Sequence, residues 1–262
     1  MRLSISNIGW DATNDMVVYE LMKKYGYSGL EIAPTRIIPE NPYDNLKVAE
    51  SWAKELNIKE GFTVPSMQSI WFNCQEKLFG SKEERQFLVN YTKKAIDFAE
   101  VIGCKNLVFG CPRNRNLPEG VDTLVAAVFF KELGDYAAEH HTVIGMEANP
   151  PIYNTNYIND TSSALELIEQ VGSDGFKLNL DVGTMIQNGE EIEELNDKVD
   201  CISHVHISEP GLKLIEQRDI HKKLMKLLMN ENYRGFVSIE MGKRDDVAEI
   251  KQVLMYVGEI FG

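Results

Sequence analysis

The segment TVIGMEANP (142–150) is a short apolar run that leads into an acidic residue, Glu147. Three later segments repeat this arrangement: FKLNLDVGT (176–184) with Asp181, CISHVHISE (201–209) with His206, and FVSIEM (236–241) with Glu240. The four polar residues are 34, 25 and 34 positions apart, and each interval is about the length of one strand plus one helix. The pattern predicts an α/β protein in which successive parallel strands end in polar side chains.

Strand-like and helix-like segments alternate along the whole chain. The strand-like runs are 2–8, 29–33, 64–70, 106–110, 143–148, 177–182, 202–207 and 236–241. The longest helical segment is 81–103, where Ser81 and Glu84 form a capping-box start, and the last is 245–261. Eight strand–helix units in about 250 residues predict a single (β/α)₈ TIM barrel as one domain over 1–262. An open doubly wound sheet is the alternative, but the chain has neither GxGxxG after its first strand nor GxxxxGK[ST] anywhere.

Bulk properties limit the classes of partner. With 44% hydrophobic residues among 262, the chain can form one large core or two small ones. A net charge of −13 argues against a nucleic-acid partner, and the apolar runs are too short to span a bilayer. No signal peptide is recognisable, and four cysteines without a CxxC pair fit a reduced, cytoplasmic protein. We expect a small-molecule, carbohydrate-like substrate, and a homo-oligomer is an open alternative to a monomer.

The four strand-end residues predict a metal site. In a parallel barrel the active-site groups come from the carboxyl ends of the strands, so Glu147, Asp181, His206 and Glu240 would converge there. Charges at the ends of buried strands are costly unless something compensates them. Three carboxylates and one imidazole favour a hard or borderline divalent cation over a zinc ion of the kind that cysteine thiolates bind. We expect one ion, with Mn²⁺ preferred and Mg²⁺, Co²⁺ or Zn²⁺ as alternatives.

A second set of residues at or just beyond strand ends consists of candidates for binding substrate. Asn149 shares a face with Glu147, and His204 shares one with His206, because residues two apart in a strand point the same way. An amide can hydrogen-bond a sugar hydroxyl, and a tryptophan can stack on an apolar sugar face. The full set of candidates is Gln68, Trp71, Arg113, Asn149, Thr184, His204, Glu209 and Arg218, and Glu31 also lies at a strand end.

The segments VIGMEANP, LNLDVGTM, HVHISEP and NYRGFVSIEM resemble those of the xylose isomerase-like TIM-barrel superfamily, which includes the sugar phosphate isomerase/epimerase family. The resemblance implies that Glu147, Asp181, His206 and Glu240 bind the divalent ion. It also implies that Glu147 and Glu240 transfer protons as a pair, one on each face of the substrate. Thr184 stands where many members have a histidine, and Leu212 stands where the ketose epimerases have an arginine, which makes Arg218 the next candidate.

These observations predict a metal-dependent isomerase or epimerase that acts on a sugar- or polyol-derived keto substrate by enediolate proton transfer. One alternative is a metal-dependent lyase on the same scaffold, dehydrating a keto-cyclitol or a dehydroshikimate-like acid. An arginine aimed at a substrate carboxylate would favour that lyase, and Arg113 and Arg218 are the residues to test. More remote alternatives are a class-II apurinic endonuclease, which needs more than the five histidines present here, and a non-catalytic binding protein with a degenerate site.

Overall fold

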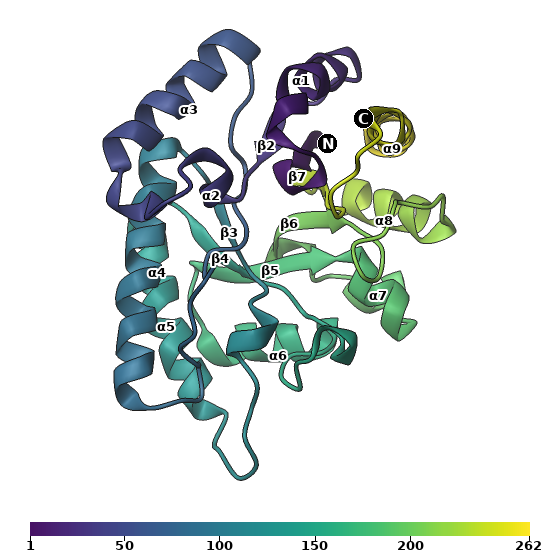
Figure 1. Cartoon of the computed structure of the whole chain (residues 1–262). Coiled ribbons are helices and arrows are strands. Elements are labelled where there is room, and N and C mark those ends of the chain that lie inside the picture. Colours follow the sequence, from purple (N-terminus) through teal and green to yellow (C-terminus); the bar gives the residue numbers. More distant parts are fainter.

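The computed structural model describes residues 1–262 and has a seven-stranded parallel sheet at its centre (Figure 1). The sheet curls into a barrel of the TIM type, and its strand order is β2-β1-β7-β6-β5-β4-β3. Buried apolar residues of the strands and the surrounding helices form one continuous core. The strands are β1 (Arg2–Ser6), β2 (Gly29–Glu31), β3 (Asn106–Phe109), β4 (Val143–Met146), β5 (Phe176–Asp181), β6 (Ile202–Ile207) and β7 (Phe236–Ile239).

The eighth position of the barrel is an extended segment, residues 63–68, that lies between β2 and β3. Met67 bridges Ile32 on one side and Leu107 on the other, both in parallel. Its neighbour Gln68 donates its backbone N–H to Ile32 O (2.9 Å). The regular strand expected over 64–70 is therefore wrong. Pro65 has no N–H to donate, so a continuous ladder cannot form there, and isolated bridges close the barrel instead.

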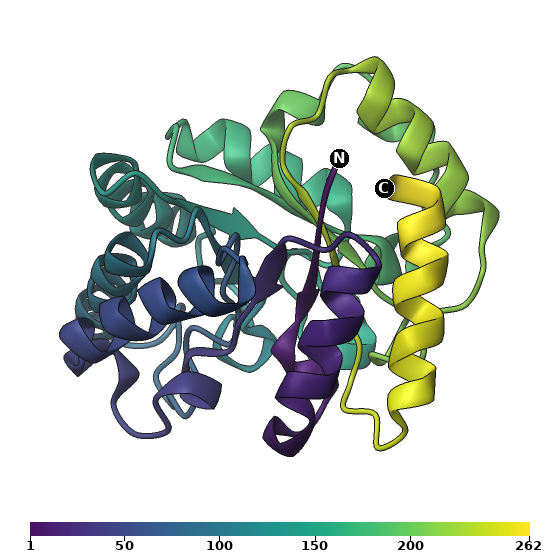
Figure 2. The same cartoon turned by 90° about the horizontal axis from the view of Figure 1, so that it is seen from above.

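Helices cover the outside of the barrel. They are α1 (Asp15–Lys24), α2 (Pro34–Ile37), α3 (Leu46–Glu60), α4 (Lys82–Ile102), α5 (Leu124–Glu139), α6 (Thr161–Val171), α7 (Val182–Asn188), α8 (Asp219–Asn230) and α9 (Val247–Phe261). The first and last helices pack against each other, as β1 does with β7, so the two ends of the chain close the ring (Figure 2). None of these helices combines the length and the apolar character that crossing a membrane requires.

The expected capping box is confirmed at the start of α4. The Ser81 hydroxyl accepts from Glu84 N (3.2 Å), and the Glu84 carboxylate accepts from Ser81 N (2.7 Å). The helix ends at Gly103, whose positive φ of 72° lets the chain turn away. The two caps fix where α4 begins and ends, and therefore where β3 can begin after it.

Side chains that point into the barrel are mostly polar. On β5, Leu178 and Leu180 are buried core residues, and the intervening Asn179 lies opposite His204 of β6 in the register. Asn106 of β3 donates to Asn179 Oδ1 (3.2 Å) and accepts from Ser203 Oγ (2.7 Å). This neutral hydrogen-bonded layer lies below the carboxyl ends of the strands and supports the charged layer above it.

Candidate active site and metal centre

Four strand ends bring their side chains to one point. Glu147 and Glu240 directly follow β4 and β7, and Asp181 and His206 are paired in the register of β5 and β6. The candidate ligand atoms of these four residues all lie within 4.8 Å of one another. We call this group the strand-end wall. The structure therefore brings together the four strand-end side chains that the sequence singled out.

His206 lies at the centre of the strand-end wall and is fully buried. Its Nδ1 is 2.9 Å from Glu147 Oε1 and 3.3 Å from Glu240 Oε2. Asn179 from the layer below donates to Glu147 Oε1 (2.9 Å). Asp181 accepts from Ser208 Oγ (2.5 Å). Each carboxylate is thus held in a defined orientation before any ligand arrives.

A further carboxylate, Glu31, lies behind the imidazole. Glu31 is fully buried at the end of β2, and its Oε2 is 2.9 Å from His206 Nε2. The Gln68 amide donates to both Glu31 Oε1 (3.0 Å) and Glu240 Oε1 (2.9 Å). A carboxylate on the outer nitrogen of a histidine orients the ring and makes it a better metal ligand. The strand-end position of Glu31 was the only sequence signal for this role, which depends on a contact across the barrel.

The electrostatics of the strand-end wall reveal uncompensated negative charge. Burial, together with repulsion from Glu147 and Glu240, raises the pKa of Asp181 to about 7. Burial also raises the pKa of Glu240. Burial alone would lower the pKa of His206, but Glu31 and Glu240 outweigh it and raise that pKa well above its usual value. A divalent cation would neutralise this charge, and the donor set of three carboxylates and one imidazole fits one.

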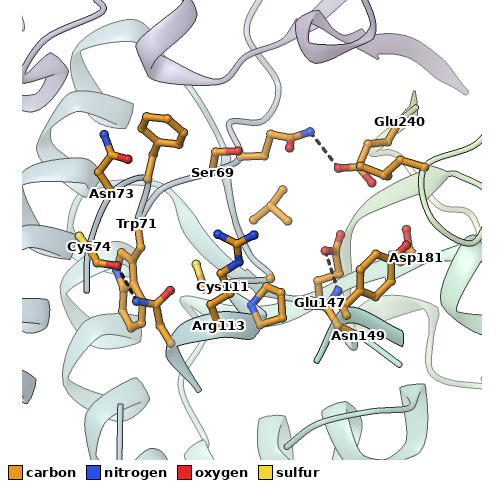
Figure 3. Close-up of a pocket in the computed structure, with 18 of the residues that line it drawn as sticks. Ser69, Trp71, Asn73, Cys74, Cys111, Arg113, Glu147, Asn149, Asp181 and Glu240 are labelled. Atoms are coloured by element: carbon orange, nitrogen blue, oxygen red, sulfur yellow. Dashed lines mark hydrogen bonds between the residues drawn. The ribbon is translucent and has the colours of Figure 1, made fainter. Parts of the chain in front are cut away.

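The strand-end wall borders a cavity of about 440 Å³. Glu147, Asp181 and Glu240 lie on one side of it, and Trp71, Cys74 and Arg113 lie on the other (Figure 3). The opposite side consists of two loops, residues 69–77 and 110–114, which we call the loop wall. A cavity of this size accommodates a small molecule between the two walls.

Four of the eight candidate substrate-binding residues line this cavity: Gln68, Trp71, Arg113 and Asn149. Trp71 is buried and donates its indole N–H to Thr92 Oγ1 (2.8 Å). Asn149 donates to Glu147 Oε2 (3.2 Å). Gln68 and Asn149 therefore support the acidic residues from the cavity side.

The other four, Thr184, His204, Glu209 and Arg218, are outside the cavity lining. Thr184 is buried, and its hydroxyl donates to Ala148 O (2.8 Å), so it braces the backbone next to Glu147. His204 lies one layer below, with Nε2 3.0 Å from Glu31 Oε2 but not in hydrogen-bonding geometry. Arg218 forms a bidentate pair with the buried Glu209, with both N···O distances at 2.7 Å. The charges of that pair are directed at each other instead of at the cavity.

Arg115 is a residue that the sequence analysis missed. It is fully buried, and burial lowers its pKa to about 10. It donates to Glu147 O (2.8 Å), to Asn149 Oδ1 (3.1 Å) and to Ile158 O (3.1 Å). It therefore fixes the backbone that carries Glu147. No local signal separates it from Arg113, two residues earlier in the same turn.

Comparison with solved structures identifies chains of the same architecture. The 3-keto-D-glucoside 4-epimerase of E. coli superposes with a TM-score of 0.75 at 18% identity, covering 99% of each chain. The D-psicose 3-epimerase of Clostridium cellulolyticum H10, solved with D-tagatose, gives 0.76 at 15% identity, covering 100% of this chain and 99% of that one. The D-allulose 3-epimerase of Methylomonas sp., in complex with D-allulose, gives 0.70 at 16% identity, covering 100% and 94%. At these identities the likeness establishes a shared fold.

A search of curated proteins returns no match. The family model described as xylose isomerase-like TIM barrel matches residues 19–257, which is most of the chain and includes all four residues of the strand-end wall. The barrel with its closing segment, the convergence of the four strand ends and this match agree with one another. The chain belongs to the xylose isomerase-like TIM barrel family.

Proposed function

We propose that the protein is a divalent metal-dependent isomerase or epimerase acting on a keto substrate of sugar or polyol type. The observation that carries the proposal is the pair Glu147 and Glu240. They come from non-adjacent strands, both line the same cavity, and both lie within reach of one central imidazole. The fold shared with several sugar epimerases is consistent with this reaction class.

In this proposal Glu147, Asp181, His206 and Glu240 hold the cation, with Mn²⁺ preferred and Mg²⁺, Co²⁺ or Zn²⁺ as alternatives. The cation would supply the positive charge that stabilises an enediolate next to the substrate carbonyl. One glutamate removes the proton from the carbon beside that carbonyl. The other returns a proton to the opposite face, which inverts the centre, or a proton returns to the neighbouring carbon, which isomerises the sugar.

Gln68 and Asn149 set the orientation of the two glutamates in this scheme. The Gln68 amide holds one oxygen of Glu240, and the Asn149 amide holds one oxygen of Glu147. Asn179 also donates to the other oxygen of Glu147, so both oxygens of that carboxylate are held, whereas the Gln68 bond holds Glu240 through Oε1. Geometric control of this kind is what lets a carboxylate act on one face of a bound substrate.

A lyase is a second candidate, and Arg113 is the observation that favours it. The sequence left two arginines as candidates for binding a substrate carboxylate. The structure places Arg113 in the cavity lining and pairs Arg218 with Glu209. The first proton abstraction would be the same in a lyase, but the reaction would then expel a β-hydroxyl group as water instead of returning a proton.

One experiment tests both candidates. Keto-sugars, inososes and sugar phosphates are incubated in deuterated water with the Mn²⁺-loaded protein and followed by NMR. Deuterium at the carbon next to the carbonyl, with a new epimer or isomer, supports the main proposal. New alkene or enone signals with loss of water support the lyase. Absence of exchange in all substrates, with metal bound, would contradict both, and a protein that binds no Mn²⁺ on reconstitution would indicate a non-catalytic binding protein.

A further inference from the structure

We propose that the substrate carries an anionic oxygen group, a phosphate or a carboxylate, at the end remote from its carbonyl, and that Arg113 binds this group. The inference rests on the proposed function, because it takes the strand-end wall as the place where the carbonyl binds. It adds the class of substrate that the opposite wall of the cavity would accept.

The first observation is that the Arg113 side chain lines the cavity without a partner. No carboxylate oxygen lies within 4.0 Å of its guanidinium, and the side chain makes no hydrogen bond within the protein. Arg36 and Arg218, by contrast, are each paired with a carboxylate. Figure 3 shows Arg113 extending from the loop wall into the space in front of Glu147. Its five N–H donors are therefore free for a ligand.

The second observation is that the backbone directly after Arg113 is anchored. The buried Asn114 donates through Nδ2 to Cys74 O (3.0 Å) and Glu76 O (2.9 Å), and its own carbonyl accepts from Leu78 N (2.8 Å). The next residue, Arg115, donates to the backbone carbonyl of Glu147. Arg113 therefore extends from an anchored part of its loop, and this lowers the backbone entropy lost on binding.

The third observation is the balance of charge in the cavity. Its acidic lining residues are Glu147, Asp181 and Glu240, which all belong to the strand-end wall, and a divalent cation would offset two of their three negative charges. The remaining charged lining residues are Arg113 and Lys77, whose Nζ donates to Arg113 O (2.8 Å). With the divalent cation bound, the two basic side chains exceed the remaining negative charge of the lining by one, and an anionic group on the substrate would balance that excess.

The chemistry of the guanidinium identifies the kind of group it would bind. Its planar fork matches the paired oxygens of a carboxylate or a phosphate, and such charge-assisted bonds are stronger than bonds to a hydroxyl. Both anions use the same two donors, so the geometry points to the shared chemistry, and the experiment must separate the two sources.

The test uses three six-carbon ketoses of the same configuration that differ only at the end remote from the carbonyl: D-fructose with a hydroxymethyl group, D-fructose 6-phosphate, and D-fructuronate with a carboxylate. Binding to the Mn²⁺-loaded protein is measured by calorimetry, and deuterium exchange is measured in parallel. We expect wild-type protein to prefer one or both anionic ketoses over D-fructose by about 10- to 100-fold. The anionic compound that shows this preference identifies phosphate or carboxylate as the source.

Variants connect the preference to Arg113. In Arg113→Met the preference should fall to within about threefold of unity, and Arg113→Lys should keep a reduced part of it because lysine retains charge but loses the fork. The matched control Arg234→Met removes the same charge from an exposed residue just before β7, at the opposite end of that strand, and should keep the wild-type preference.

Equal affinity of wild-type protein for all three ketoses would overturn the inference, and so would a preference that survives in Arg113→Met. These results are separate from failure of the proposed function. Arg113-dependent anion binding without any deuterium exchange would uphold this inference and reject the isomerase. Deuterium exchange at equal rates on neutral and anionic ketoses would uphold the proposed function and reject this inference.

Discussion

The two walls of the cavity are built in different ways. The strand-end wall consists of buried side chains at the ends of barrel strands, and each is held by partners such as Asn179, Gln68 and Ser208. The loop wall consists of two short loops joined by Asn114, and it presents exposed cationic side chains. Groups that perform chemistry need rigid strands, whereas groups that select a substrate can vary on loops without disturbing the barrel. The first three predictions below perturb the strand-end wall, and the last perturbs the loop wall and asks whether the strand-end wall is unaffected.

The largest expected effect is the loss of proton transfer when a carboxylate of the strand-end wall is removed. Glu240→Gln keeps the shape of the side chain but cannot accept a proton, so deuterium exchange next to the carbonyl should fall by about 10²- to 10⁴-fold. NMR in deuterated water measures this rate. Glu119→Gln, an exposed loop acid outside the cavity lining, is the control and should exchange at the wild-type rate. Full exchange in Glu240→Gln would reject Glu240 as the base.

Metal removal should destabilise the protein through the strand-end wall. At a free Mn²⁺ concentration of about 100 times Kd, binding to the folded state adds about 2.7 kcal/mol to the free energy of unfolding. Denaturant unfolding with Mn²⁺ and with a chelator measures the difference. Asp181→Asn removes one candidate ligand, so the difference should shrink at the same metal concentration. An undiminished stabilisation in Asp181→Asn would place the metal elsewhere.

The buried carboxylate of Glu31, behind the His206 imidazole, should raise the affinity for Mn²⁺ although it is not one of the proposed ligands. Glu31→Gln keeps the packing but removes the negative charge beside His206 Nε2, and Mn²⁺ affinity should fall by about 10- to 100-fold. Calorimetric titration measures it. Glu209→Gln is the matched control, because Glu209 is also a buried glutamate just past a strand but faces Arg218. Glu209→Gln should lower the free energy of unfolding and leave Mn²⁺ affinity unchanged. A comparable fall in Mn²⁺ affinity in both variants would show that Glu31 has no specific role in metal binding.

The smallest expected effect concerns the loop wall. Asn114→Ala removes the two hydrogen bonds that join the loops, so the free energy of unfolding should fall by about 1–2 kcal/mol. Mn²⁺ affinity should remain at the wild-type value, because the strand-end wall has its own partners. Asn116→Ala, an exposed residue of the same loop, is the control and should change stability by less than about 0.5 kcal/mol. A parallel loss of metal affinity in Asn114→Ala would show that the two walls are coupled.

Most strands and helices were predictable because their signals are local. Runs such as 202–207 and the capping box at Ser81 are confirmed at or near their expected bounds. The strand-like run 64–70 is the exception, because Pro65 has no N–H to donate to a regular ladder and only isolated bridges form there. The convergence of Glu147 and Glu240 was also predictable, because parallel strands place their carboxyl ends at the same rim of a barrel.

Other features of the site depended on contacts that no local pattern encodes. Glu31 supports His206 from 175 residues away in the sequence. Arg113 and Arg115 occupy the same turn, yet one lines the cavity and the other is buried beneath Asn149. Thr184 and Arg218 were both candidates for binding substrate, but the fold pairs them with Ala148 O and Glu209.

The sequence by itself determined the α/β repeat, the barrel and the four polar strand ends, because periodicity, capping and strand polarity are properties of short segments. Tertiary structure alone decided which buried groups orient those four residues. It also decided which basic side chain is left unpaired on the opposite wall of the cavity. The physical reason is that a side chain's partner is chosen by distance in space, and in a closed barrel the nearest polar group often comes from a strand far away in the sequence.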